Sequence, residues 1–166
     1  RVAFEVLCNT DNADHPDITI IVADASNLKR NLFLVSQIID LKIPVILVLN
    51  MMDMVEKEGD VIDTIRLSEK LGVKVLVNHA VKSVKRTEIN LKSGEKIYLH
   101  CWGGHGRAGT LYCIILYLLY DMDATDILNH CQCIHDCRVN FITVSSPQTL
   151  IQTIQVRRII DSLRIE

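Results

Sequence analysis

The sequence predicts an α/β fold, with residues 1–166 forming a single three-layer α/β/α domain around a mostly parallel sheet. Short continuous runs rich in Ile and Val, such as 17–24 and 44–50, are typical of strands buried on both faces of a sheet. Segments with apolar residues at helical spacing alternate with these runs, which indicates β-α-β units. The length of 166 residues, 49% of them hydrophobic, suits one well-packed core.

The first half of the chain contains two such β-α-β units. Its elements follow in the order strand 17–24, helix within 27–41, strand 44–50, helix within 59–72 and strand 73–78. Ser26 or Asn27 is the expected N-cap of the first helix, because short polar side chains accept hydrogen bonds from free backbone amides. Gly72 is the expected C-cap of the second, since glycine adopts the left-handed conformation at helix ends.

The second half resumes the pattern after a polar, basic segment at 80–94. Its expected elements are a short strand 87–91, a strand 95–101, and helices within 109–122, 123–137 and 145–163. The helix at 109–122 is apolar nearly all round, which is typical of a helix buried in the middle of a domain. Asp123 lies near the cap of the next helix, and Ser146 and Pro147 are the expected N-cap and N1 residues of the last.

Composition excludes several classes of protein. A net charge of −2 argues against a general nucleic-acid binder, which needs a basic excess. No apolar run approaches the ~20 residues that span a bilayer, and the N-terminus lacks the order of a signal peptide, so we expect a soluble cytoplasmic protein without a membrane partner. The six scattered cysteines are expected to be reduced.

The stretch YLHCWGGHGRAGT at 98–110 ends a strand on Cys101 and continues into a glycine-rich loop before a helix. Glycines let the backbone curl with its N–H groups pointing inward, and the helix adds the positive end of its dipole, which predicts an anion site. These groups and Arg107 favour the thiolate of Cys101, a nucleophile for an incoming phosphate. The expected phosphate-binding residues are Trp102, Gly103, Gly104, His105, Gly106 and Arg107.

HCWGGHGRAGT, together with the later VSSPQTLIQTIQVRRII, resembles the cysteine-dependent protein tyrosine and dual-specificity phosphatases over residues 92–165. The resemblance implies that Cys101 forms a phosphocysteine, that Arg107 clamps the phosphate, and that His100 helps the thiol to ionise. Ala108 stands where most of that family has Ser or Thr, which predicts a slow second step. The interval 66–80, where the family has its general-acid Asp, contains neither Asp nor Pro.

Residues 1–82 resemble a second family, the GTPase domain of the prokaryotic ferrous iron transporter B. NMMD stands where that family has its guanine-reading Asn-x-x-Asp, so the resemblance implies that Asn50 contacts the purine and that Asp53 accepts from guanine N1 and N2. Ala80 matches the last base-contacting loop. No G-x-x-x-x-G-K-[ST] phosphate loop occurs in the sequence, so we expect weak nucleotide binding.

The two resemblances predict a chain joined near residues 82–92 from a GTPase-like half (1–82) and a phosphatase-like half (83–166), which favours a recombined or engineered protein. In a parallel sheet the functional loops collect at the carboxyl ends of the strands. Asp24, Asn50, Asp53, Asn78 and Cys101 are all expected at such ends. Asp53 or Asp24 is therefore a candidate substitute for the missing acid, against the alternative that each caps a turn.

The sequence thus favours slow hydrolysis of phosphate monoesters or phosphoproteins, with Cys101, Arg107 and Asp53 as catalytic residues and no cofactor. Two alternatives are an anion-binding scaffold without turnover and a guanine-nucleotide module using Asn50 and Asp53. A metal site at His130, Cys133 and Cys137 is a further alternative, because these residues share one helical face. A helix with buried thiols is the preferred interpretation, since zinc sites draw ligands from at least two elements.

Overall fold

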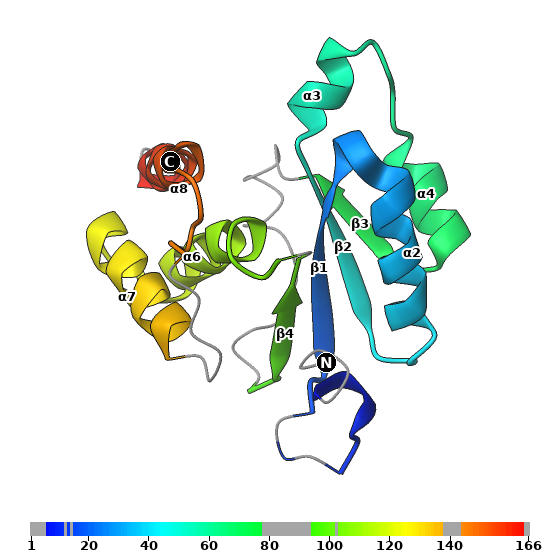
Figure 1. Cartoon of the computed structure of the whole chain (residues 1–166), viewed down its shortest axis with the longest axis horizontal. Helices are drawn as coiled ribbons and strands as arrows, with labels where there is room; N and C mark the ends of the chain where they lie inside the picture. Colours follow the sequence, from blue (N-terminus) through cyan, green and yellow to red (C-terminus); the bar gives the residue numbers. More distant parts are fainter. Residues whose placement is uncertain are drawn as a thin grey trace. The chain divides into compact units, whose positions relative to one another are not determined.

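A four-stranded, all-parallel sheet organises the N-terminal part of the chain (Figure 1). Its strands lie in the order β3-β2-β1-β4. Their bounds are β1 Ile18–Asp24, β2 Val45–Asn50, β3 Lys74–Val77 and β4 Ile97–His100. The α/β class and the parallel sheet are confirmed, and all four strands form within segments that the sequence predicts to be strands.

The computed structural model describes residues 6–11, 13, 15–77, 94–101, 103–137 and 144–164. The strand expected at 87–91 lies outside these residues, as do Asn78, Ala80 and Trp102. The chain divides into two compact units, Arg1–Trp102 and Gly103–Glu166, and each is described by itself. The single domain and the junction at 82–92 stay predictions.

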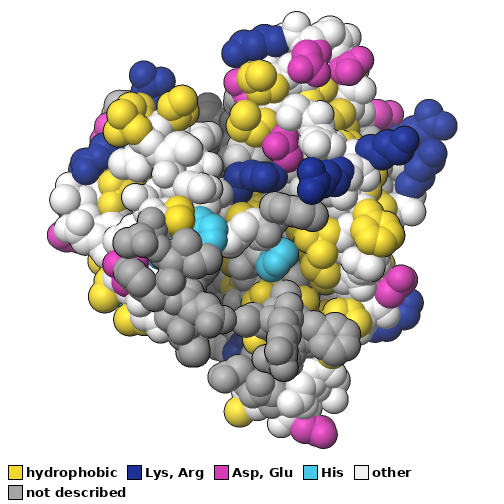
Figure 2. All heavy atoms as spheres, viewed as in Figure 1, with side chains coloured by type: hydrophobic (Ala, Val, Ile, Leu, Met, Phe, Trp, Pro, Cys, Tyr) yellow, Lys and Arg dark blue, Asp and Glu magenta, His cyan; other side chains and the backbone are white. Residues whose placement is uncertain are grey.

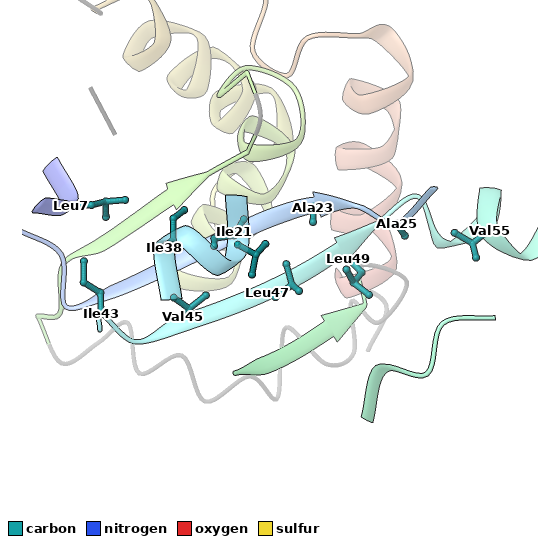
Figure 3. Packing of buried hydrophobic residues seen from close by; sticks show 11 residues of the cluster. Leu7, Ile21, Ala23, Ala25, Ile38, Ile43, Val45, Leu47, Leu49 and Val55 are labelled. Carbon is teal, nitrogen blue, oxygen red and sulfur yellow. The ribbon is translucent and has the colours of Figure 1, made fainter. Parts of the chain in front are cut away.

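Two helices of the N-terminal unit cover one face of the sheet. The helical elements of this unit are η1 Ala25–Asn27, α2 Leu28–Ile39, α3 Met52–Lys57 and α4 Thr64–Leu71. Leu28 and Leu32 of α2 and Leu67 of α4 pack on a buried cluster contributed by alternate residues of β1 and β2. Figure 3 shows this cluster, including Ile21, Ala23, Leu47 and Leu49. Burial of this shared face stabilises the unit, because it removes apolar area from water.

The ends of these helices differ in part from the sequence expectation. Asn27 occupies the N-cap position of α2, as predicted, but its side chain makes no capping hydrogen bond. A 3-10 turn precedes α2, and Asp24 caps that turn by accepting from the Ser26 amide. The helix within 59–72 begins only at Thr64, capped by Asp63, and ends as predicted on Gly72 with φ of 66°.

The C-terminal unit contains three helices, α6 Arg107–Tyr120, α7 Ala124–Asp136 and α8 Leu150–Arg164. Asp123 caps α7 as predicted, accepting from the Thr125 amide. The expectation that Ser146 and Pro147 begin the last helix is wrong. Thr149 and Gln152 form a reciprocal capping box instead, with Gln152 N donating to Thr149 Oγ1 and Thr149 N donating to Gln152 Oε1.

Apolar and charged side chains are mixed on the surface. Figure 2 shows hydrophobic side chains beside acidic and basic ones over α3, where Met51 and Met54 are exposed. Scattered exposed apolar residues are normal on a folded protein. Within the described ranges, no helix combines the length and the apolar character that a bilayer crossing requires.

We predict that Leu47→Ala lowers the free energy of unfolding by about 2–5 kcal/mol, because Leu47 of β2 is fully buried in this cluster and the substitution leaves a cavity. Urea denaturation measures the loss. Ile65→Ala is the matched control, since Ile65 is 73% exposed on α4. Equal losses in the two variants would contradict the packing described for this cluster.

Candidate functional site

Polar residues gather at the carboxyl ends of the parallel strands. Asp24 ends β1 and Asn50 ends β2, and their Cα atoms are register partners. Cys101 follows His100, the last residue of β4. Because parallel strands all end at one edge of the sheet, these residues share that edge. The strand-end prediction is confirmed for Asp24, Asn50 and Cys101, but it is wrong for Asp53, which lies in the first turn of α3.

A tight turn after β2 carries the Asn50–Asp53 pair. Met51 adopts the left-handed conformation with φ of 66°, and its amide donates to Asn50 Oδ1 at 2.9 Å. Asn50 is buried, so its amide group is held in one orientation at the end of the strand. Asp53 lies in the first turn of α3, with a side chain 47% exposed. The turn therefore combines an oriented amide with an accessible carboxylate.

The two candidate substitute acids both have local partners. Asp24 Oδ1 accepts from Ser26 N at 3.1 Å and from Ser26 Oγ at 2.7 Å, so its carboxylate caps a turn. Asp53 Oδ2 lies 3.7 Å from Lys57 Nζ within α3. The strand before Asp53, β2, is also separated by β1 from the strand before Cys101, β4, which amounts to two strand spacings of about 4.8 Å each. A catalytic role for Asp53 stays a prediction.

The partly buried position of His100 at the end of β4 favours the neutral form of its imidazole. Burial lowers its pKa, because a charged ring loses hydration there. Its ring stacks on Tyr98 with centroids 5.9 Å apart, and its Nδ1 is buried without a hydrogen-bond partner among the described residues. A neutral ring adds no positive charge beside Cys101, which is itself only 3% exposed. The expected help of His100 to ionisation of the Cys101 thiol stays a prediction.

The glycine-rich loop belongs to the C-terminal unit, whereas Cys101 belongs to the N-terminal one. Gly104 has φ of 71°, the left-handed conformation that the predicted curl requires. Gly106 is the N-cap of α6, and its carbonyl accepts from Thr110 N at 2.9 Å and Thr110 Oγ1 at 3.0 Å. Arg107 is the first residue of α6. The loop therefore opens directly into a helix, as predicted.

A hydrogen-bonded histidine pair next to this loop is a feature that the sequence reasoning missed. His105 Nδ1 lies 2.7 Å from Nε2 of His135, which is buried at the end of α7. Ser146 Oγ donates to the His105 carbonyl at 2.9 Å. No sequence signal joins these residues, because 30 and 41 positions separate them from His105.

The cysteine-rich helix α7 buries one thiol and exposes two. Cys131 is buried, but Cys133 and Cys137 are exposed, so the interpretation of buried thiols is wrong for these two. His130 stacks on Tyr112 with centroids 6.3 Å apart. Within the part of the chain that the structure describes, no three His, Cys, Asp or Glu side chains are grouped to hold a metal ion. A hydrogen bond to Cys131 and burial raise the pKa of the Cys113 thiol, which therefore stays protonated.

The family described as ferrous iron transport protein B matches residues 1–92, more than half of the chain. The chain belongs to the ferrous iron transport protein B family. This confirms the resemblance at residues 1–82 and extends it by ten residues. The matched region contains β1, β2 and β3 together with Asn50 and Asp53, but it ends before β4.

Relatives in the ferrous iron transport protein B family are similar to this chain over only a small part of their own length. The Fe(2+) transporter FeoB of Salmonella typhimurium is 43% identical over 72 residues, which cover 43% of this chain and 9% of that protein. The chain thus spans about a tenth of the length of the curated relatives that it matches.

Two solved structures are similar to parts of this chain. The FeoB G-domain from Methanococcus jannaschii is 34% identical, covers 46% of each chain and has a TM-score of 0.42. Tk-PTP in the active form is 14% identical, covers 89% of this chain and 79% of its own, and has a TM-score of 0.45. Both TM-scores are below 0.5, so neither structure assigns a function.

We predict that His100→Gln makes the free energy of unfolding less sensitive to acid. Because the folded pKa of His100 lies below its ordinary value of 6.5, the unfolded chain binds a proton that the folded chain does not. Stability should therefore fall as the pH falls through 6.5, and less steeply in the variant. Urea denaturation across this range measures the slope. His130→Gln, which replaces an exposed ring, should keep the wild-type slope, and an unchanged slope in His100→Gln would refute the assignment.

Proposed function

We propose that the chain binds a guanine base through Asn50 and Asp53. The observation that carries the proposal is the turn after β2, where a buried, oriented Asn50 precedes a half-exposed Asp53 by three residues. Membership of the ferrous iron transport protein B family supports it, since the matched residues include this turn. Its position at the carboxyl edge of a parallel sheet is where such folds bind ligands.

The chemistry of the two side chains favours guanine over adenine. Asp53 presents carboxylate oxygens, which accept from the N1–H and N2–H groups of guanine, whereas adenine offers an acceptor at N1. Asn50 Oδ1 already accepts from Met51 N, so the Nδ2 group is the part of the amide that suits the O6 and N7 acceptors of a purine. Adenine would leave the carboxylate facing a lone pair, which provides selectivity.

Affinity should be weak, because the sequence lacks the G-x-x-x-x-G-K-[ST] loop that binds nucleotide phosphates. Base contacts alone leave the phosphates in solvent. We therefore propose base recognition for this chain, and not the transport that the name of its relatives denotes.

We predict that Asp53→Asn weakens GDP binding by about 10-fold or more, because a charged hydrogen-bond acceptor is lost. The same variant should bind xanthosine diphosphate better than GDP, since an Asn amide can donate to the xanthine O2 atom. Calorimetry with GDP, ADP and xanthosine diphosphate measures both effects. Asp60→Asn, at an exposed position in the same unit, is the control and should keep the preference for GDP. Equal binding of GDP and ADP by the wild type would overturn the proposal.

A second proposal is phosphate-monoester chemistry at Cys101. It is favoured by a thiol directly after β4 and an arginine that opens the 14-residue helix α6 through a glycine-rich loop. The sulfur would attack phosphorus and expel the alcohol, which takes up a proton, and water would then hydrolyse the phosphocysteine. Asp53 is the proposed proton donor, and Ala108 provides no hydroxyl for the second step. Binding of the anion without turnover is the alternative.

The proposed join of two families accounts for the presence of both features in one chain. The family match ends at residue 92, and the Cys-x-x-x-x-x-Arg segment begins nine residues later at Cys101. Parallel α/β parents would each contribute a carboxyl-edge loop to such a product.

We predict that an aryl phosphate with a good leaving group gives a burst of phenol of about one equivalent per chain. The phenol leaves without an acid, and the phosphocysteine then breaks down slowly because Ala108 has no hydroxyl. The burst should vanish in Cys101→Ser, drop about 100-fold in rate in Arg107→Lys, which loses bidentate contact, and persist in the control Cys133→Ser. Mass spectrometry of Cys101 alkylation completes the test. Protection of Cys101 by inorganic phosphate without a burst would support anion binding without turnover. Absence of both the burst and the protection would exclude hydrolysis and anion binding alike.

A further inference from the structure

A closed ring of hydrogen bonds in the C-terminal unit joins the glycine-rich loop to the end of α7. His105 Nδ1 contacts His135 Nε2 at 2.7 Å, and His135 Nδ1 lies 3.3 Å from Asp136 Oδ1. Gln132 Nε2 donates to the same Asp136 oxygen at 2.7 Å. Gln132 Oε1 then accepts from Ser146 N at 2.8 Å, and Ser146 Oγ returns to the His105 carbonyl at 2.9 Å.

The carboxylate of Asp136 determines where the imidazole protons lie. An ionised carboxylate only accepts hydrogen bonds, so His135 carries its proton on Nδ1. A neutral imidazole has one N–H, which leaves the Nε2 atom of His135 as an acceptor. The 2.7 Å contact then requires His105 to donate from Nδ1. His105 is thereby held as the Nδ1–H tautomer, with its lone pair on Nε2.

The ring anchors the side chain and the backbone of His105 separately. His135 contacts the imidazole, whereas Ser146 bonds the main-chain carbonyl. His135 is only 3% exposed, which excludes water from its bond to His105. A change at His135 should therefore alter the ring of His105 while the Ser146 contact keeps the loop in place.

We propose that His135 is a positioning residue that, with Asp136, orients His105 to bind a phosphate group through Nε2. This inference rests on the second proposed function, because it adds His105 to the groups that would bind phosphate at the glycine-rich loop. When phosphate binds, Nε2 of His105 takes a proton from solvent and donates it to a phosphate oxygen. The imidazolium keeps its Nδ1–H bond to His135, and the Asp136 carboxylate stabilises the added charge through that residue.

Nitrogen-15 NMR of the imidazole rings tests the positioning in the full chain without ligand. We expect both His105 and His135 as Nδ1–H tautomers. His135→Gln places an amide oxygen near the former Nε2 position and should preserve the His105 tautomer, whereas His135→Leu should release it to the Nε2–H form. His130→Gln on the same helix is the matched control and should change neither signal. An Nε2–H tautomer of His105 in the wild type would overturn the proposal.

Titration with inorganic phosphate tests the link to anion binding. We expect phosphate to give His105 the nitrogen-15 signature of an imidazolium and His135→Leu to weaken phosphate binding about 10-fold, with recovery in His135→Gln. Phosphate binding that is unchanged in His135→Leu overturns this inference but leaves the second proposed function intact. Failure of the wild type to bind phosphate overturns both the second proposed function and the role of His105 as a phosphate ligand. The tautomers measured without ligand would still decide whether His135 orients His105.

Discussion

Parallel pairing of β1 with both β2 and β4 is the constraint on which the chemistry of the N-terminal unit depends. In-register pairing aligns Asp24 with Asn50, and β4 delivers Cys101 to the same edge. The alternate side chains of β1 and β2 form the face that α2 and α4 cover, so a register shift of one residue would exchange this packed set of side chains and separate Asp24 from Asn50. The strand register therefore determines both the packing of the core and the placement of the candidate functional residues.

In the C-terminal unit, close packing between segments distant in sequence defines the geometry of the glycine-rich loop. A side chain at Gly109 would overlap Ser146 Oγ, so glycine permits the approach of the segment that bonds His105. Cys131 also contacts both Gly109 O, at 3.8 Å, and Ser146 Oγ, at 3.5 Å. The geometry of the loop before α6 thus depends on residues of α7 and on the segment before α8. Loop residues alone do not define it.

Elements with strong periodicity could be predicted from the sequence, whereas short elements and long-range polar contacts could not. The buried runs of β1 and β2 and the caps Gly72 and Asp123 are local signals. Helix α3 has six residues, too few for a periodic pattern. Ser146 resembles an N-cap locally, but its hydroxyl bonds the distant His105 carbonyl, which is why α8 begins later. The buried His135 had no sequence signal, because its partner is remote along the chain.

The family match and the turn after β2 together support the proposed guanine recognition, and the thiol loop carries the second, separable proposal. Amide NMR during a GDP titration tests this most directly. The account predicts that signals of residues 50–53 shift with saturation and that ADP at equal concentration leaves them in place. Shifts confined to other residues, or identical shifts with ADP, would contradict it.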